Sequence, residues 1–179
     1  MHTLTNPLLV ADVLHYPDET FQARLICTLE SLEGPPLQHV IAFSEEVANV
    51  VPAGLEELYT QTFDLNPVAT LEVGWHLWGE QYERGRFLAE LRELQDSLGV
   101  GDGTNLPDHL TLLLETIAKA PSQKVTALRG QVLTALEKIL KPLEEHGNPY
   151  RHLIRAAMAT IQAEVFQPAA TATAEGGAA

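Results

Sequence analysis

The sequence predicts an all-α fold, a compact single domain of eight or nine helices. Apolar residues recur at helical spacing along most of the chain, for example at Leu110, Leu113, Leu114 and Ile117. No stretch of five residues alternates strictly between apolar and polar side chains with turn residues at both ends, so strands are not expected. The 179 residues, 45% of them hydrophobic, are enough to bury one core. No segment repeats at a fixed period, which excludes a solenoid.

The helices expected in the first half of the chain are bounded by glycine and by Asn-Pro pairs. They span residues 6–16, 18–33, 36–51, 54–64 and 67–78. Gly34 and Gly79 follow periodic segments, where a helix commonly ends on a left-handed residue. Asn66-Pro67 offers a capping side chain and then a proline at the first helical position, which predicts a helix start at 67. The stripes for 36–51 and 54–64 are Leu37, Val40, Ile41, Ser44, Val47, Ala48 and Val51, then Leu55, Leu58, Tyr59 and Thr62.

Glycines and an Asn-Pro pair also bound the helices expected in the second half of the chain. Its expected helices span residues 83–98, 107–120, 122–145 and 149–166. Gly99 and Gly147 follow periodic segments, and Asn148-Pro149 predicts the start of the last helix. The stripes for 83–98, 122–145 and 149–166 are Phe87, Leu91, Leu94 and Leu98, then Val125, Leu128, Val132, Leu136, Ile139 and Leu143, then Ile154, Ala157, Met158, Ile161 and Val165.

Two segments have the composition of flexible chain. Residues 99–105 (GVGDGTN) form a connection between two strong helices, and the sequence predicts a hinge there, which leaves a monomer and a helix-swapped dimer open. Residues 167–179 are small, polar and rich in glycine, which predicts a helical domain at 1–166 followed by a flexible tail.

The charge is acidic and unevenly distributed. The net charge is −13, and from residue 1 to 80 a single base, Arg24, stands against twelve acids, which leaves −11 in that stretch. An acidic chain lacks the basic surface that nucleic acid requires, so the expected partner is a basic peptide or protein surface. No secretory signal and no apolar run long enough to span a membrane is present, which indicates a cytoplasmic protein that does not insert into the membrane.

Motifs for catalysis or cofactor binding are absent. The seven histidines are scattered, and no HxxxH or HExxH pair places two imidazoles on one helical face. The glycines at 99, 101 and 103 follow a predicted helix rather than a strand, which excludes a dinucleotide fingerprint. The sequence contains neither GxxxxGK[ST] nor GxSxG, and the single Cys27 excludes a disulfide and a cysteine-based zinc site. We expect no cofactor and no metal, and a binding protein rather than an enzyme.

Two features keep more than one interpretation, whereas a third, Cys27, has a single one. Cys27 lies in the apolar run 21–32 and is expected in or near the core. Trp75 and Trp78 lie three residues apart on one predicted helix and either fill the core or line a peptide groove. Asp108-His109 stands at a predicted helix start, where Asp108 caps the helix and His109 packs against its neighbours, or both bind a partner, or both serve acid–base catalysis.

Three motifs in order resemble those of a known family. They are Tyr59-Thr60-Gln61-Thr62-Phe63-Asp64, then Arg84-Gly85 ahead of Leu88, then Leu106-Pro107-Asp108-His109-Leu110. Together they are similar to the NarJ-type nitrate reductase delta-subunit chaperones, relatives of the TorD and DmsD redox-enzyme maturation proteins. The resemblance covers about residues 55–118.

The resemblance implies a cytoplasmic, all-helical assembly chaperone. Such a protein binds the catalytic molybdenum subunit of a type II oxidoreductase before cofactor insertion, commonly through the N-terminal peptide of that subunit. A nitrate-reductase-type enzyme is the expected client, and perchlorate, chlorate, selenate, dimethylsulfide and hydrocarbon oxidoreductases stay open. The alternative is a helical regulatory or scaffold protein that binds an unrelated cytosolic amphipathic peptide.

A leader peptide with an apolar helical face and adjacent arginines requires an apolar groove with an acidic rim. For each candidate the ordinary interpretation is core packing or a solvated helix face. The apolar candidates are Tyr59, Phe63, Trp75, Trp78, Leu110 and Leu114. The acidic rim candidates are Glu45, Glu46, Glu56, Glu57 and Asp64, and the resemblance adds Asp108 and His109.

Overall fold

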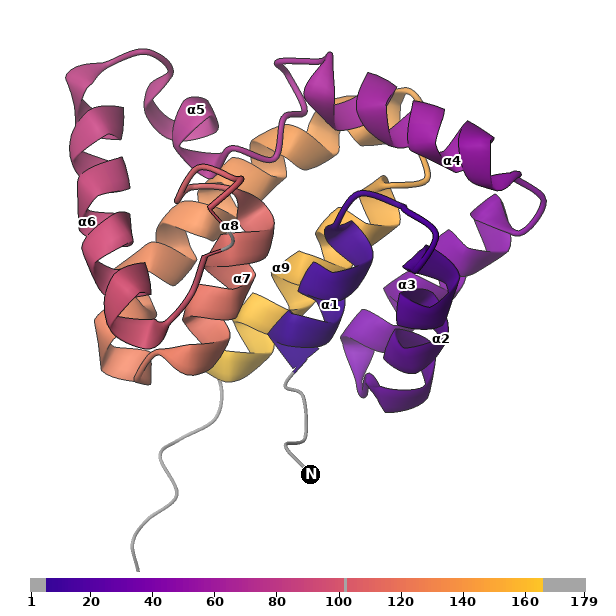
Figure 1. Ribbon diagram of the computed structural model, residues 1–179, viewed down its shortest axis with the longest axis horizontal. Coiled ribbons are helices and arrows are strands. Elements are labelled where there is room, and N and C mark those ends of the chain that lie inside the picture. Colours follow the sequence, from indigo (N-terminus) through magenta and orange to yellow (C-terminus); the bar gives the residue numbers. More distant parts are fainter. Residues whose placement is uncertain (1–5, 102, 166–179) are drawn as a thin grey trace, which may run out of the picture.

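Nine α-helices and one π-helical turn make up the part of the chain that the computed structural model describes, residues 6–101 and 103–165 (Figure 1). The all-α fold is confirmed, since these residues contain no strand beyond one isolated bridge between Glu72 and His109. The predicted tail at 167–179 lies outside the described residues. The elements are α1 (Asn6–Leu14), α2 (Phe21–Ser31), α3 (Pro35–Val47), α4 (Pro52–Tyr59), η1 (Thr60–Asp64), α5 (Val73–Trp78), α6 (Tyr82–Leu98), α7 (Leu110–Lys119), α8 (Ser122–Glu145) and α9 (Arg151–Val165).

Helices from the two ends of the sequence meet at the centre of the molecule. α1 packs against α2, α7 and α9, and α9 in turn runs along α3 and α8. α5 rests on α6 and α8, so that α5 and α6 stand at one side of the ribbon and α2 and α3 at the other, with α4 crossing the top (Figure 1). α7 lies between α1 and α8 and is buried on nearly all sides, which explains its almost continuous apolar sequence, LTLLLETIAK.

An aromatic cluster ties three elements together below η1. The ring of Tyr150 lies 5.2 Å from that of Phe43, 5.7 Å from that of Tyr59 and 4.9 Å from that of Phe63, measured between centroids. These tilted and edge-on contacts add to the burial of large rings. The cluster therefore fixes α3, α4 with η1, and the start of α9 against one another.

The segment predicted as helix 54–64 ends in a π-helical turn. The Leu65 N–H donates to the Thr60 oxygen at 3.0 Å, a bond that spans five residues and inserts one extra residue into the turn. Tyr59 and Phe63 face the core while Asp64 is exposed. Such turns are rare and occur frequently at functional sites.

The predicted helix at 67–78 is wrong over its first half, since α5 begins only at Val73. The Asn66 side chain accepts the Val68 N–H at 3.3 Å, as a capping residue would, but residues 67–69 form only a turn. The backbone then pairs with the segment before α7: Leu110 N–H donates to Leu71 O and Val73 N–H to Asp108 O, both at 2.9 Å. These long-range bonds flank Glu72, whose backbone is extended, directly ahead of α5.

Two further expectations concern Cys27 and the connection after α6. Cys27 is exposed rather than buried, because α2 turns Phe21, Leu25 and Thr28 toward the core and Cys27 away from it. The connection after α6 is anchored at its start, where Val100 is buried and its N–H donates to the Gln95 oxygen at 2.9 Å. The hinge in this connection stays a prediction.

Candidate functional site

Several pockets open around η1, and three of them that share lining residues in series are together called the η1 hollow. The outer pocket, about 450 Å³, lies beside α4 and is lined by Tyr16, Ala53, Glu56, Glu57, Thr60, Gln61 and Leu65. The middle pocket, about 340 Å³, is lined by Phe63, Asp64, Leu65, Pro67, Thr70, Glu72, Trp75 and Arg84. The inner pocket, about 220 Å³, is lined by Tyr59, Phe63, Asp64, Thr70, Leu71, Glu72, Asn105 and His109. Leu65 joins the outer pocket to the middle one, and Asp64 and Glu72 join the middle one to the inner one.

Apolar side chains are unusually open to solvent in the hollow. Leu65 directly follows η1 and is 73% exposed, and Tyr16 at the mouth of the outer pocket is 44% exposed. The Tyr16 ring lies edge-on to Tyr59, with centroids 5.4 Å apart, so the exposed ring is continuous with the buried aromatic cluster. Exposed apolar surface rimmed by polar groups is typical of interaction sites.

The acids of the hollow differ in what they bind. Glu57 accepts from the Gln61 amide at 2.8 Å, and Glu56 receives a long contact of 3.5 Å from the Tyr16 hydroxyl. The Asp64 carboxylate has no hydrogen-bond or ion-pair partner among the described residues. Burial, and after it the Asp64 charge, raises the pKa of Tyr59 above its ordinary value, so the Tyr59 hydroxyl stays neutral and donates to Leu14 O at 3.3 Å. The hollow therefore carries a negative charge that the chain itself does not neutralise.

Arg84 on α6 joins two carboxylates across the middle pocket. Its Nε donates to Asp108 Oδ2 at 3.2 Å, and its Nη2 donates to Glu72 Oε2 at 2.8 Å. The guanidinium also lies 5.8 Å from the centroid of the Trp75 ring, within cation–π range. Glu72 belongs to the acidic first half of the chain, so Arg84 joins that half to the buried Asp108.

Asp108 caps a different helix from the one predicted. It is fully buried, and its Oδ2 accepts the Gly74 N–H at 3.1 Å, in the first turn of α5. Burial raises the pKa of Asp108, and the Arg84 guanidinium offsets part of that shift. The predicted cap on the helix of Asp108 itself is wrong, since α7 begins at Leu110 without a side-chain cap. His109 lines the inner pocket, and its Nδ1 lies 2.8 Å from Thr111 Oγ1.

The structure brings together seven of the predicted residues in the hollow and leaves the others elsewhere. Leu110 and Leu114 have no exposed area and lie in the core between α1 and α8. Trp78 turns to α6 and packs on Phe87, with ring centroids 4.8 Å apart, whereas Trp75 donates its Nε1 hydrogen to Pro67 O at 3.1 Å. The residues in the hollow are Tyr59, Phe63, Asp64, Trp75, His109, Glu56 and Glu57.

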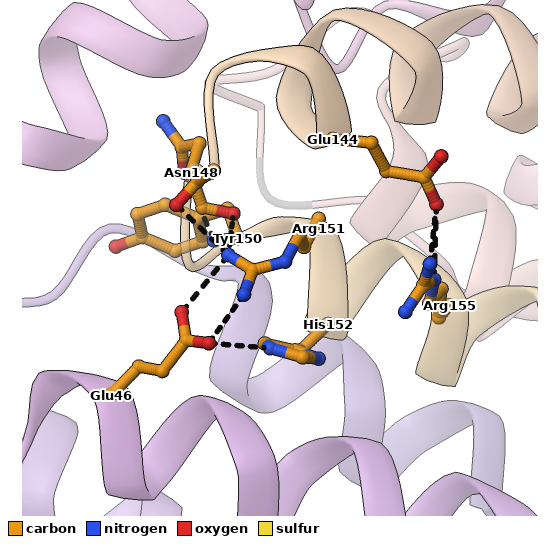
Figure 2. A network of polar contacts seen from close by, with 8 residues as sticks. Glu46, Glu144, Asn148, Tyr150, Arg151, His152 and Arg155 are labelled. Carbon is orange, nitrogen blue, oxygen red and sulfur yellow. Dashed lines mark hydrogen bonds and ion pairs between the residues drawn. The ribbon is translucent and has the colours of Figure 1, made fainter.

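Glu45 and Glu46 lie outside the hollow, at the end of α3. Glu46 accepts from the Arg151 guanidinium with both oxygens, and one of them also lies 3.0 Å from Nε2 of His152 (Figure 2). Glu46 therefore joins α3 to the start of α9. Glu45 is exposed and lines none of the three pockets.

The sequence did not indicate several residues of the hollow, and three of them, Glu72, Leu65 and Tyr16, supply its charge or its exposed apolar surface. Glu72 was placed inside a helix that does not form there, so its position opposite His109 could not be seen. Leu65 and Tyr16 belong to connections between helices and carry no periodic signal. The one available signal was the unbalanced acid content of the first half, which contains Glu72.

The geometry fits binding rather than catalysis. Among residues 6–101 and 103–165, no group of three or more His, Cys, Asp or Glu side chains could hold a metal ion. In the same part of the chain, no helix combines the length and apolar character needed to cross a bilayer. What the hollow offers is exposed apolar surface, unpaired carboxylate and a rigid polar network behind it.

Comparison with known proteins gives consistent matches. Residues 31–156 match the family model described as nitrate reductase delta subunit. The probable nitrate reductase molybdenum cofactor assembly chaperone NarJ of Bacillus subtilis (strain 168) is 27% identical over 155 residues, which are 84% of either chain. The nitrate reductase molybdenum cofactor assembly chaperone NarJ of Escherichia coli (strain K12) is 27% identical over 152 residues, which are 80% of this chain and 64% of that protein.

Proposed function

Because this chain belongs to the nitrate reductase delta subunit family, we propose that it is a molybdenum cofactor assembly chaperone of the cytoplasm. Its client is the catalytic molybdenum subunit of a nitrate-reductase-type enzyme, which it binds through the N-terminal peptide of that subunit before the cofactor is inserted. The relatives carry the names of assembly chaperones, not of catalysts, in agreement with the prediction of a non-enzyme.

The observation that carries this proposal is the pairing of exposed apolar surface with uncompensated acid in the η1 hollow. Leu65 and Tyr16 offer apolar contact area, and Asp64 offers an unpaired carboxylate beside them. An amphipathic peptide with arginines next to an apolar face is complementary to both features. An acidic partner would be repelled by the Asp64 carboxylate. A purely polar partner would leave the apolar surface of Leu65 and Tyr16 without apolar contacts.

The proposal is tested by calorimetric titration of the chain with a synthetic peptide that copies the N-terminus of the catalytic subunit. A second peptide, in which glutamate replaces each arginine, serves as the matched control. We expect saturable binding of the first peptide and at least about tenfold weaker binding of the second, because charge reversal adds repulsion to the loss of attraction.

Purification from the native host adds an independent readout. We expect the chain to co-purify with the immature catalytic subunit and not with the mature enzyme that contains molybdenum. Failure to bind the native peptide, together with failure to co-purify with the immature subunit, would contradict the proposal and would favour a helical scaffold protein with another partner.

A further inference from the structure

We propose that Asp64 and Glu72 form a subsite in the inner pocket for one arginine side chain of the client, and that Arg84 is the positioning residue that orients Glu72. This inference rests on the proposed function and specifies which part of the hollow binds a positively charged side chain of the peptide. It also selects Glu72, which the sequence did not indicate, over Asp108, which it did.

The two carboxylates stand at the same small cavity. Both line the inner pocket of about 220 Å³, together with the aromatic side chains of Tyr59 and Phe63. Asp64 has no partner, and Glu72 uses only its Oε2, toward Arg84, so its Oε1 has no partner among the described residues. The pocket thus combines free carboxylate oxygens with ring surface, which a planar guanidinium can contact at the same time.

The charge balance leaves this pocket negative. Asp64, Glu72 and Arg84 line the middle pocket, and Arg84 pairs with Glu72 and with the buried Asp108, so that one guanidinium stands against three carboxylates. Asp108 is fully buried and is held by Arg84 and by the Gly74 N–H, so it cannot reach a ligand. Two negative charges therefore remain at the pocket, on the side chains that solvent can reach.

The backbone holds Glu72 in place, and Arg84 directs its side chain. The bridge to His109 and the hydrogen bonds at Leu71 and Val73 immobilise the peptide units on both sides of Glu72. The ion pair of 2.8 Å with Arg84 then orients the carboxylate, whose side chain is 36% exposed, against 16% for Arg84. A carboxylate that is already ordered loses less conformational entropy when it binds a cation.

The chain itself shows that a guanidinium fits this environment. In the adjoining middle pocket, Arg84 lies between the Glu72 carboxylate and the Trp75 ring. An arginine in the inner pocket would meet the same kinds of groups on the opposite side of Glu72. Lysine lacks the planar fork that contacts two carboxylates and a ring together, so arginine is the preferred occupant.

The experiment compares two peptides in titrations with the wild-type chain and three variants. One peptide keeps the native arginines of the client, and in the other citrulline, which is neutral and nearly isosteric, replaces them. The variants are Asp64→Asn, Glu72→Gln and, as a control, Glu45→Gln, which removes one exposed charge outside the hollow. Melting curves verify that each variant is folded.

We expect the wild type to prefer the arginine peptide about tenfold, and Asp64→Asn and Glu72→Gln to lose most of that preference, since each removes a charge-assisted contact. Their affinity for the citrulline peptide should stay within about twofold of wild type, as should both affinities of Glu45→Gln. If Asp64→Asn and Glu72→Gln keep the full preference, the subsite is elsewhere and the inference is overturned, while the proposed function stands. If the wild type binds neither peptide, the inference is overturned, and co-purification with the immature subunit then decides whether the proposed function falls with it.

The positioning role of Arg84 has its own readout. In Arg84→Lys the positive charge is kept but the simultaneous contact with Asp108 and Glu72 is lost. We expect the preference for arginine over citrulline to fall about as far as in Glu72→Gln, with unchanged affinity for the citrulline peptide. If Arg84 had a purely structural role, Arg84→Lys would lower the affinity for both peptides equally or for neither. Either result would overturn the positioning role.

Discussion

Gly74 is the residue on which the polar network behind the hollow depends most directly. A Cβ atom there would lie 2.7 Å from Asp108 Oδ2, 3.2 Å from the Arg84 side chain and 3.3 Å from the Phe87 ring. Asp108 cannot withdraw, because it is buried and bonded to Arg84. We expect Gly74→Ala to lower the free energy of unfolding by about 1–3 kcal/mol, as overpacking commonly does. Urea denaturation measures the change.

Gly85 is the matched control for this substitution. It lies inside α6, and an added Cβ would meet no atom within 4 Å. Because alanine is the better helix former, Gly85→Ala should raise the free energy of unfolding by up to about 1 kcal/mol. Opposite signs in the two variants are the expected result, and a stabilising Gly74→Ala would contradict the described packing around Asp108.

At the scale of the elements, the contact between α3 and α9 contains a histidine whose pKa is lowered in the folded chain. The charges of Arg155 and His152 on α9 act on His39 of α3. On the same two helices, Glu46 binds Arg151 and His152 (Figure 2). Burial, and then the charges of Arg155 and His152, lower the pKa of His39 from its ordinary value of 6.5. The folded chain therefore binds this proton less tightly than the unfolded chain. The stabilisation is complete above the ordinary pKa and is lost as the pH falls below it.

We expect the melting temperature to fall between about pH 7.5 and pH 5.5, and His39→Gln to show a smaller fall. Part of the fall should persist, because burial also lowers the pKa of His76. His146→Gln serves as the control, since His146 is exposed and directly follows α8. Identical pH profiles for the wild type and His39→Gln would show that the α3–α9 contact does not depend on this histidine.

At the scale of the whole molecule, we expect the net charge of −13 to raise the association rate constant for a basic partner. Residues 1–80 carry most of the excess acid, and they include Glu56, Glu57, Asp64 and Glu72 of the hollow. We expect the association rate constant for the arginine peptide to fall about tenfold between about 20 mM and 500 mM salt, with a smaller change in dissociation. Stopped-flow fluorescence measures both rates, and an association rate independent of salt would contradict electrostatic steering.

Most of the helices were predictable because their signals are local. The prediction for 122–145 agrees with α8 as observed, and Gly99 follows α6 in the left-handed conformation that the sequence predicted. Gly34 differs, since α2 already ends at Ser31 and Gly34 directly precedes α3. The failure at 67–72 has a non-local cause. Hydrogen bonds to residues 108–110, more than thirty positions away, replace the helical bonds that Asn66-Pro67 indicated.

By itself, the sequence determined the all-α fold, the acidic first half and the family, since periodicity, charge and short motifs are properties of neighbouring residues. Only the tertiary structure decided which acids share a pocket. A π-helical turn exposes Asp64 while it buries Phe63, and a backbone bridge carries Glu72 to the same cavity, where Arg84 orients it. Asp108, a residue of the motif at 106–110, is buried and accepts hydrogen bonds from the Gly74 N–H in the first turn of α5 and from Arg84. These positions depend on contacts between distant segments, which local spacing does not encode.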